Sequence, residues 1–343
     1  MTHPKVQAMR VLVTGASGRV GRRLVTALQS DGHWIRGFDV IPPPFDPTLD
    51  DLALGALHDL EALAGAIEGM DAVIHLAAFM SWLPSDEGRL FETNVRGTHD
   101  LADLAARHGV KRLVFASSGE VYPELAPVRL PIDESHPTLP TSAYGTSKLL
   151  GEEIVRAYGR RSGLETCILR FAHTQSPEEL LDPNSFFSGP RFYVNAKLRQ
   201  LRKLPASPAV ARSIEALEAV ATSEERHYIG CSADGLPYRM GICDVRDMVH
   251  GLQLALTQPA AAGETFNIGP AESFDFGRAV PYLARATGLS TVTVPLHTTA
   301  YHYDTSVDKA RTVIGYTPRH SIFDMIDAAI QWRDARPGEE AAT

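Results

Sequence analysis

The sequence predicts an α/β fold: a Rossmann-type doubly wound parallel sheet with a smaller C-terminal substrate-binding lobe. Two observations predict it. The apolar run Val11–Val13 is typical of a buried strand, and it is followed by three glycines and by apolar residues at helical spacing. Further short apolar runs alternate with helical patterns up to about residue 170, as in a sheet whose strands are all parallel.

The three glycines form a strand-to-helix turn that suits a dinucleotide. Gly15 would allow a tight turn, Gly18 would let the backbone approach a pyrophosphate, and Gly21 would let the helix pack closely on the strand. The N-terminus of that helix adds free N–H groups and a partial positive charge. A plain turn can carry the same glycines, so the interpretation depends on the residues that follow.

The second predicted strand, Trp34–Asp39, ends in a carboxylate. Asp39 follows Gly15 by 24 residues, which is about the distance at which a carboxylate accepts hydrogen bonds from the adenosine ribose. A carboxylate there would repel the extra phosphate of NADP, and no Arg or Lys follows at once. We therefore expect NAD as the cofactor. The alternative is an aspartate that only caps a turn.

Composition excludes several classes of function. The 343 residues carry a formal net charge of -8, which argues against a nucleic-acid partner and against binding to an anionic membrane. The three cysteines are far apart, the histidines lack metal-ligand spacing, and no apolar run is long enough to span a bilayer. Met1–Arg10 has no apolar core of a signal peptide. We expect no metal, no membrane and a cytoplasmic location.

The remaining elements follow in order along the chain. A short third strand is expected within residues 46–57, a helix capped by Asp59, a buried strand at residues 72–78 and a helix over residues 88–108. His75 is interpreted as a satisfied core histidine. Strands at 112–117 and 166–170 complete this part. Helices are then expected at 208–225, 274–287 and 322–332, with a strand at 291–295.

These elements predict a division into two units. Residues 1–175, joined by 232–262, form the NAD-binding domain, and residues 176–231 and 263–335 form the substrate-binding lobe. Residues 336–343 are expected to be a flexible tail.

Tyr144 and Lys148 open a predicted helix that runs to about residue 161. At a spacing of four they share one helical face, and a nearby ammonium favours the phenolate of a tyrosine. A free phenol, with a pKa near ~10, is too weak a base at neutral pH, so this pairing matters. Most such pairs are only exposed helix faces. Behind a glycine turn and the strand end Ser117-Ser118, the pair indicates an acid/base site.

With these residues in place, the chain resembles the extended short-chain dehydrogenases/reductases, the NAD-dependent epimerase/dehydratase family. The segments that carry the resemblance are Thr14–Gly21, Asp39, His58–Leu60, His75–Ala78, Asn94 with Gly97 and Thr98, Ser117–Ser118 before Val121–Tyr122, Tyr144–Lys148, Asp244–Asp247, Gly263–Gly269, Asp304–Lys309 and Gly315–Pro318. They cover nearly the whole chain and are specific for the family, not for a substrate.

The resemblance implies roles for individual residues. Tyr144 would exchange a proton with a substrate hydroxyl, Lys148 would hold the nicotinamide ribose, and Ser118 would bind the same substrate oxygen while a hydride passes to the nicotinamide. The cofactor-binding residues implied are Gly15, Ser17, Gly18, Arg19, Val20, Gly21, Asp39, Asp59, Leu60, Leu76, Ala77, Ala78, Asn94, Ala116, Tyr144, Lys148, Phe171 and His173. The substrate-binding residues implied are Phe79, Ser81, Ser118, Gly119, Glu120, His173, Asn195 and Arg239.

Three positions depart from the common family pattern. Arg19 stands where an apolar residue is frequent, and it would either contact the pyrophosphate or lie exposed. Glu120 matches a catalytic Glu of sugar-nucleotide dehydratases and decarboxylases, but Gly119 lacks their preceding acid; a structural carboxylate is the alternative. His173 replaces the usual Asn, and it would either bind substrate or simply pack.

The basic run within residues 195–203 would either meet an anionic substrate or form a solvated face. The expected function is NAD-dependent oxidoreduction at a hydroxyl of a small-molecule carbohydrate, as an epimerase or a dehydrogenase. A decarboxylase or dehydratase using Glu120, and a non-catalytic NAD-binding sensor or scaffold, are the alternatives. By analogy with the family, a homodimer is expected through the helices at residues 88–108 and 144–161.

Overall fold

A seven-stranded parallel sheet forms the larger part of the molecule, which a computed structural model describes over residues 8–43, 49–298 and 301–336. The strand order is β11-β6-β5-β4-β1-β2-β3. The strands are β1 (Arg10–Thr14), β2 (Trp34–Asp39), β3 (Asp51–Leu54), β4 (Ala72–His75), β5 (Arg112–Ser118), β6 (Glu165–Phe171) and β11 (Thr265–Ile268). The order in which successive strands are added reverses beside β1: β2 and β3 lie on one side of it, and β4, β5 and β6 lie on the other. Such folds bind their ligands at this point. The predicted fold class is confirmed.

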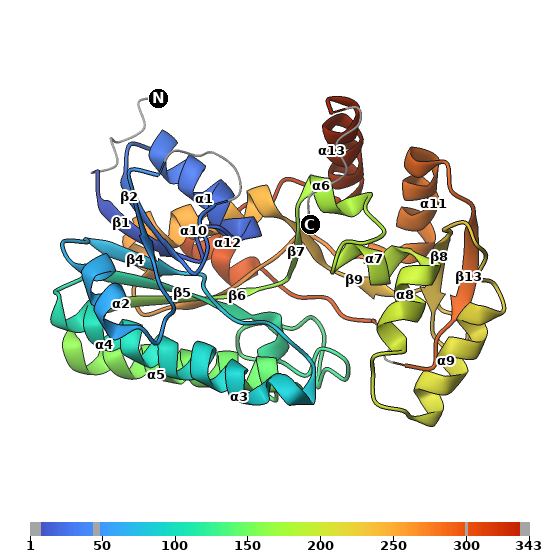
Figure 1. Cartoon of the computed structure of the whole chain (residues 1–343), viewed down its shortest axis with the longest axis horizontal. Coiled ribbons are helices and arrows are strands. Elements are labelled where there is room, and N and C mark those ends of the chain that lie inside the picture. The colour runs from blue at the N-terminus through green and yellow to red at the C-terminus, as the bar shows by residue number, and fades with distance from the viewer. Residues whose placement is uncertain (1–7, 44–48, 299–300, 337–343) are drawn as a thin grey trace.

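Helices cover both faces of this sheet (Figure 1). One face carries α1 (Arg19–Ser30), α10 (Val245–Thr257) and α12 (Asp308–Ile314), and the other carries α2 (Leu60–Ile67), α4 (Gly97–Arg107) and α5 (Ala143–Ser162). Leu24 and Leu28 of α1 and Leu252 of α10 are buried in one of the two cores, because the helical repeat brings these apolar residues to one side.

The helix predicted over residues 88–108 is one continuous run with a wider turn inside it. α3 (Glu87–Leu90) leads through a π-helical turn, Phe91–Arg96, into α4. His75 is buried as predicted: its ring nitrogens lie 2.7 Å from Thr14 Oγ1 and 3.1 Å from Thr98 Oγ1.

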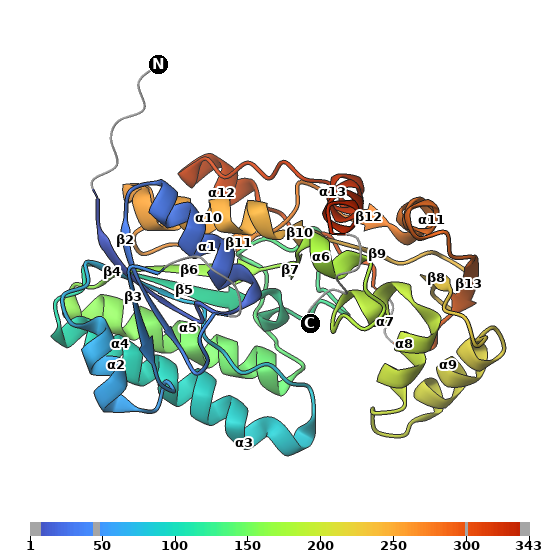
Figure 2. The same cartoon turned by 45° about the horizontal axis from the view of Figure 1, so that its top comes forward.

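The smaller lobe lies beside the carboxyl edge of the sheet (Figure 2). Its elements are α6 (Pro177–Leu180), α7 (Ser188–Phe192), α8 (Val194–Leu201), α9 (Pro208–Glu218), α11 (Phe276–Thr287), α13 (Ile322–Asp334), the parallel pair β8 (His227–Cys231) and β13 (Thr291–Pro295), and the antiparallel pair β9 (Arg239–Met240) and β12 (Phe274–Asp275). A third pair, β7 (His173–Gln175) and β10 (Ile242–Asp244), joins the lobe to the sheet domain.

Two boundaries differ from the sequence prediction. Residues 263–335 were expected in the lobe, but β11 pairs with β6 in the main sheet and α12 packs on that domain, because Phe266, Ile268 and Ile314 bury their side chains there. The helix expected to end at residue 225 ends at Glu218. The Arg226 guanidinium donates to the Val220 carbonyl at 3.0 Å and so holds the chain in a turn beyond that end.

The described residues include no helix that is both long and apolar enough to cross a membrane. They also include no group of three or more His, Cys, Asp or Glu side chains placed to hold a metal ion. Cys167, Cys231 and Cys243 are buried and free. The predicted tail falls almost entirely outside the described residues.

Candidate active site

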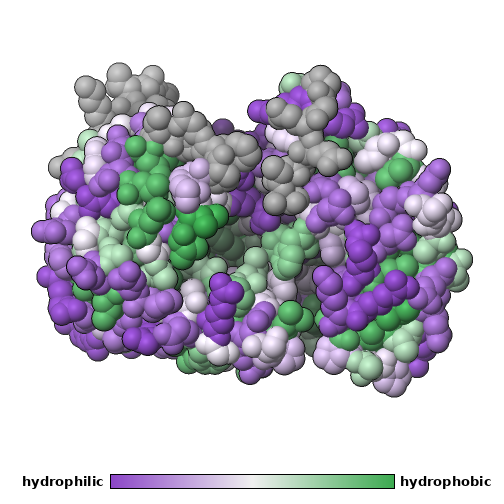
Figure 3. Space-filling model, in the orientation of Figure 1, coloured by the Kyte–Doolittle hydropathy of each residue, from purple (hydrophilic) through white to green (hydrophobic). Residues whose placement is uncertain are grey.

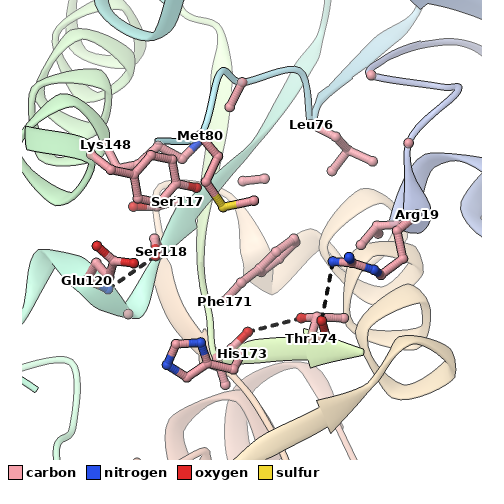
Figure 4. Close-up of a pocket in the computed structure, with 18 of the residues that line it drawn as sticks. Arg19, Leu76, Met80, Ser117, Ser118, Glu120, Lys148, Phe171, His173 and Thr174 are labelled. Carbon is pink, nitrogen blue, oxygen red and sulfur yellow. Dashed lines mark hydrogen bonds between the residues drawn. The ribbon is translucent and has the colours of Figure 1, made fainter. Parts of the chain in front are cut away.

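A cavity of about 250 Å³ lies at the carboxyl edge of the sheet, in the hollow between the two parts of the molecule (Figure 3). One end is lined by the turn after β1 and the residues that follow β4: Gly15, Gly18, Arg19, Val20, Gly21, Leu76 and Ala78. The other end is lined by Met80, Trp82, Ala116, Ser117, Ser118, Gly119, Glu120, Glu124, Tyr144, Lys148, Phe171, Ala172, His173, Thr174 and Phe187. Figure 4 shows Leu76 and Arg19 at the first end and Ser118, Glu120 and Lys148 at the second.

The glycine turn has the shape that a pyrophosphate needs. Gly15 has φ +73°, and a Cβ added there would lie 2.8 Å from the Ala77 amide nitrogen. A Cβ on Gly21 would lie 2.1 Å from the Gly15 carbonyl oxygen. Gly18 caps α1, and no side chain caps that helix end, so its first N–H groups stay open to an anion. These residues fit a bound dinucleotide.

Asp39 lies beside this turn at the end of β2. Its carboxylate accepts hydrogen bonds from the Ser17 amide at 2.9 Å and the Val40 amide at 2.7 Å. The Ser17 hydroxyl in turn donates to the Ile41 carbonyl at 2.7 Å. The Ser17 and Val40 amides thus hold the Asp39 carboxylate at the position predicted to bind the adenosine ribose.

Other predicted cofactor residues shape the site from a distance. Asp59 caps α2 by accepting from the Ala62 amide at 3.1 Å, and Leu60 begins that helix with an exposed side chain. Neither lines the cavity. Asn94 is buried: its amide group pairs with the backbone of Phe79, with both contacts at 2.8 Å, and donates to Ser147 Oγ at 3.0 Å. Asn94 therefore fixes the chain after β4 against α5.

Ser118, Tyr144 and Lys148 converge on the second end of the cavity. Ser118 ends β5, whereas Tyr144 and Lys148 lie in the first two turns of α5. The start of that helix is fixed by Ser142, whose hydroxyl accepts from the Gly145 amide at 2.9 Å. The spacing of four places both α5 side chains against the same cavity, as a shared helical face requires.

The electrostatics of these groups differ from the sequence prediction in one respect. Burial and the Glu120 carboxylate raise the pKa of Tyr144, and the hydrogen bond with Ser118 opposes them. We expected Lys148 to lower the pKa of Tyr144. The pKa is raised instead, because desolvation of the phenolate is the largest effect. Burial also lowers the pKa of Lys148 to about 8, against the opposing effect of Glu152.

A buried network behind the cavity holds β5, β6 and α5 together. The Glu152 carboxylate, which is fully buried, accepts from Ser117 Oγ at 2.6 Å and from two nitrogens of Arg170 at 2.9 and 2.8 Å. Arg170 also donates to the Tyr122 hydroxyl at 2.7 Å. The sequence motifs do not reveal this network, since its members are spread over 54 positions and meet only in the folded sheet.

Glu120 lies in the cavity and is tied to its wall. Its carboxylate accepts from Ser142 Oγ at 2.6 Å and from Trp82 Nε1 at 3.1 Å. Burial raises the pKa of Glu120, and the two donors oppose that shift.

Glu124 is a cavity residue that the sequence reasoning missed. Its carboxyl lies against Gly119, where an added Cβ would approach Glu124 Oε1 to 2.3 Å. Burial and the neighbouring Glu120 raise the pKa of Glu124 to about 8. The only signal in the sequence is an acid shortly after a motif that also carries one, and its distance from Ser118 does not predict a meeting.

His173 lies between Glu124 and Arg191. An arginine nitrogen lies 2.7 Å from His173 Nδ1, and His173 Nε2 lies 3.8 Å from Glu124 Oε2. A guanidinium can only donate, so Nδ1 is the acceptor and the ring proton lies on Nε2. Burial and Arg191 lower the pKa of His173 well below its usual value, so the ring is neutral. Arg191 was not predicted.

Arg19 reaches the cavity but is paired. It forms an ion pair with Glu179 of α6 at 2.5 Å and donates to the Thr174 carbonyl at 3.4 Å (Figure 4). The predicted contact between Arg19 and a pyrophosphate remains a prediction, with Glu179 as the competing partner.

Four predicted substrate contacts lie outside the cavity. Asn195 faces the chain after α9 and donates to the Thr222 carbonyl at 3.2 Å, whereas Arg239 pairs with Asp304 at 3.3 Å. Neither side chain reaches the cavity, because Asn195 bonds to Thr222 and Arg239 pairs with Asp304 instead. Ser81 donates to Asp86 at 2.6 Å, and Phe79 lies under the Arg89 guanidinium at 4.0 Å.

Aromatic side chains form one wall at the Tyr144 end. Trp82 stacks on Phe186 at 5.7 Å between ring centroids, and it lies 6.3 Å from Tyr144 and 6.5 Å from Phe187. Trp82 therefore touches both the predicted acid/base residue and the lobe, and its indole also holds Glu120.

Comparison with known proteins agrees with this geometry. The family model described as NAD dependent epimerase/dehydratase family matches residues 11–269. A short-chain dehydrogenase/reductase superfamily protein from Agrobacterium tumefaciens, solved with bound NAD, is 45% identical and has a TM-score of 0.89 over 95% of this chain and 97% of that one.

Two curated proteins add to the comparison. A UDP-glucose 4-epimerase of Halalkalibacterium halodurans is 26% identical over 96% of this chain and 97% of its own length. A uronate dehydrogenase of Pseudomonas syringae pv. tomato is 33% identical over 47% of this chain and 58% of its own length.

Proposed function

This chain belongs to the NAD-dependent epimerase/dehydratase family, and from that membership we propose that it oxidises a secondary hydroxyl of a small carbohydrate with NAD. The observation that carries the proposal is the convergence of Ser118, Tyr144 and Lys148 on the cavity that also holds the glycine turn. A protein that only binds NAD has no need of a serine, a tyrosine and a lysine placed together at the far end of the site.

NAD, when bound, supplies the hydride acceptor. The Ser118 hydroxyl binds the substrate oxygen, and the Tyr144 phenol exchanges the proton of that oxygen. Lys148 is fully buried beside the Phe115 ring, 4.9 Å from its centroid, and this places its ammonium for the ribose and for the phenolate. The high pKa of Tyr144 requires that the phenolate be stabilised during turnover, and the cations of the loaded site favour that change.

Dehydrogenation of a substrate without a nucleotide is the outcome that the cavity favours. The cavity of about 250 Å³ includes the glycine turn, so the bound cofactor and the substrate share it. Trp82 and Phe187 narrow its substrate end. An epimerase must turn its keto intermediate before hydride returns, and a narrow aromatic end opposes that movement.

A nucleotide-sugar epimerase is the second candidate. The match to a UDP-glucose 4-epimerase over 96% of this chain supports it, because that match includes the lobe.

One experiment separates the two candidates. The purified protein is incubated with NAD and with free hexoses, hexuronic acids and their UDP derivatives, while NADH absorbance and sugar composition are both followed. The proposal expects NADH to accumulate with a free sugar or sugar acid. Isomerisation of a UDP-sugar without net NADH would replace the proposal with the epimerase. No conversion of any compound would contradict both.

We also propose a homodimer formed through α4 and α5. Phe91, which leads into α4, and Leu150 of α5 both leave apolar side chains exposed. Light scattering on wild-type protein should give twice the chain mass, and Leu150→Glu should shift it toward one. A wild-type monomer would contradict the proposal.

A further inference from the structure

We propose that Glu124 contacts the substrate and that its carboxyl hydrogen-bonds a second hydroxyl, next to the one that Ser118 and Tyr144 hold. The inference rests on the proposed function, which supplies the class of substrate. It makes the site selective for a polyol over an alcohol with a single hydroxyl.

The position of the Glu124 carboxyl is the first argument. Its side chain is 10% exposed and lines the cavity. A Cβ on Gly119 would lie 2.3 Å from Glu124 Oε1 and 3.4 Å from its carboxyl carbon, so the carboxyl rests on the backbone of the residue that follows Ser118. Glycine at position 119 thus makes the space that Glu124 occupies beside the reacting end.

The lack of a partner is the second argument. Within the described residues, no donor lies within hydrogen-bond distance of the Glu124 carboxyl, and the nearest ring nitrogen, His173 Nε2, is 3.8 Å away. Buried polar groups are nearly always hydrogen-bonded, because an unmet carboxyl costs free energy. The cavity is the side from which a partner can come.

His173 and Arg191 lie beside the Glu124 carboxyl. Arg191 occupies Nδ1 of the ring, which leaves the Nε2 proton directed toward Glu124. Arg191 is half-buried, and one of its terminal nitrogens is buried without a partner among the described residues. Glu124 is therefore bounded by a neutral imidazole on one side and the cavity on the other.

Glu120 and Glu124 differ in a way that suits two hydroxyls. Glu120 has two donors, Ser142 and Trp82, and these favour a carboxylate that accepts. Glu124 has none, and its pKa of about 8 leaves it mostly protonated at neutral pH, so it can donate. Burial raises the pKa of both carboxyls. They differ in their hydrogen bonds, since only Glu120 has side-chain donors that favour its charged form.

The test compares parent sugars with analogues that each lack one hydroxyl. D-glucose, D-galactose and their uronic acids are assayed with NAD beside their 2-deoxy, 3-deoxy and 4-deoxy analogues, using wild type, Glu124→Ala and Glu124→Gln. We expect wild type to prefer a parent over one deoxy analogue by about 10- to 100-fold in kcat/KM, because that analogue leaves the buried Glu124 carboxyl without a hydrogen-bond partner. Glu124→Ala should bring the ratio of kcat/KM for the parent sugar to kcat/KM for the deoxy analogue close to one. Glu124→Gln should keep part of the wild-type preference, because its amide still donates.

Matched variants separate contact from folding. Gly119→Ala should reproduce the loss of discrimination, because the added methyl displaces the carboxyl. Glu153→Gln, at an exposed position on α5, should keep the wild-type ratio. NAD affinity should stay within about twofold in every variant, because Glu124 lies at the substrate end.

Retention of the wild-type ratio in Glu124→Ala and Gly119→Ala would overturn the inference and leave the proposed function standing. No turnover of any parent sugar by wild type would instead contradict the proposed function and this inference with it.

Discussion

Glu152→Gln should destabilise the protein more than any exposed carboxylate change on the same helix. The Glu152 carboxylate is fully buried and accepts from Ser117 and twice from Arg170, whose side chain is only 5% exposed. The amide keeps the shape but loses the charge, so the Arg170 guanidinium is left buried without its counter-ion. Removing one partner of a buried ion pair costs about 3–5 kcal/mol, a large part of a typical stability of roughly 5–15 kcal/mol.

Thermal and urea unfolding of Glu152→Gln measure this loss. We expect a fall in Tm of about 6–20 °C, from a loss of about 3–5 kcal/mol at roughly 2–4 °C per kcal/mol. The control is Glu153→Gln, the exposed neighbour that pairs with Arg156, which should change stability by no more than about 0.5 kcal/mol. The double variant Glu152→Met with Arg170→Met should recover more than half of the loss, because the buried Arg170 charge is removed together with its partner. Arg156, which also donates to Glu152 at 2.7 Å, keeps its ion pair with Glu153.

The pH dependence supplies a second check on Glu152. Hydrogen bonds from Arg170 and Ser117 lower the pKa of Glu152 in the folded protein despite its burial. Its contribution to stability is therefore fully present above the pKa of the unfolded chain and is lost as the pH falls through the lower folded value. Glu152→Gln should lose this acid-sensitive component. Equal destabilisation by Glu152→Gln and Glu153→Gln, or an unchanged acid profile, would refute the reasoning.

Two further predictions concern the cofactor end. Gly21→Ala should weaken NAD binding at least tenfold, because its methyl would lie 2.1 Å from the Gly15 carbonyl oxygen. The control Gly65→Ala, in α2 where nothing lies within 4 Å of an added Cβ, should leave NAD affinity unchanged. Calorimetric titration with NAD measures both affinities, and equal values would contradict the close packing at Gly21. Asp39→Ala should raise the ratio of kcat/KM for NADP to kcat/KM for NAD at least tenfold, because it removes the carboxylate beside the adenosine end and frees the Ser17 amide. Initial rates with both cofactors measure this ratio. An unchanged ratio would show that Asp39 does not select the cofactor.

The sheet domain could be predicted from sequence because local patterns specify it. β2, from Trp34 to Asp39, begins and ends where the pattern of apolar residues predicts, and Asp59 caps α2 as expected. β11 was assigned to the lobe because its four residues lie far along the chain from the other strands. Its pairing with β6 places it in the main sheet. The local pattern of apolar residues does not predict pairing between segments that are distant in the sequence.

The candidate site shows the same division. Ser118, Tyr144 and Lys148 stand in recognisable motifs, and the fold brings them to one cavity. Glu124 and Arg191 stand in no motif, since their meeting through His173 depends on how the lobe packs against the sheet. Asn195, in contrast, was predicted to bind substrate but lies outside the cavity, because its side chain bonds to Thr222 within the lobe.

The most direct test of the central claim is Tyr144→Phe, measured for turnover and for NAD binding in the same preparation. The phenol is the group that exchanges the substrate proton, so its loss should lower kcat by about 10²- to 10⁴-fold, while the NAD dissociation constant stays within about twofold because the ring still lines the cavity. Wild-type turnover in Tyr144→Phe would contradict the account, however well the variant binds NAD.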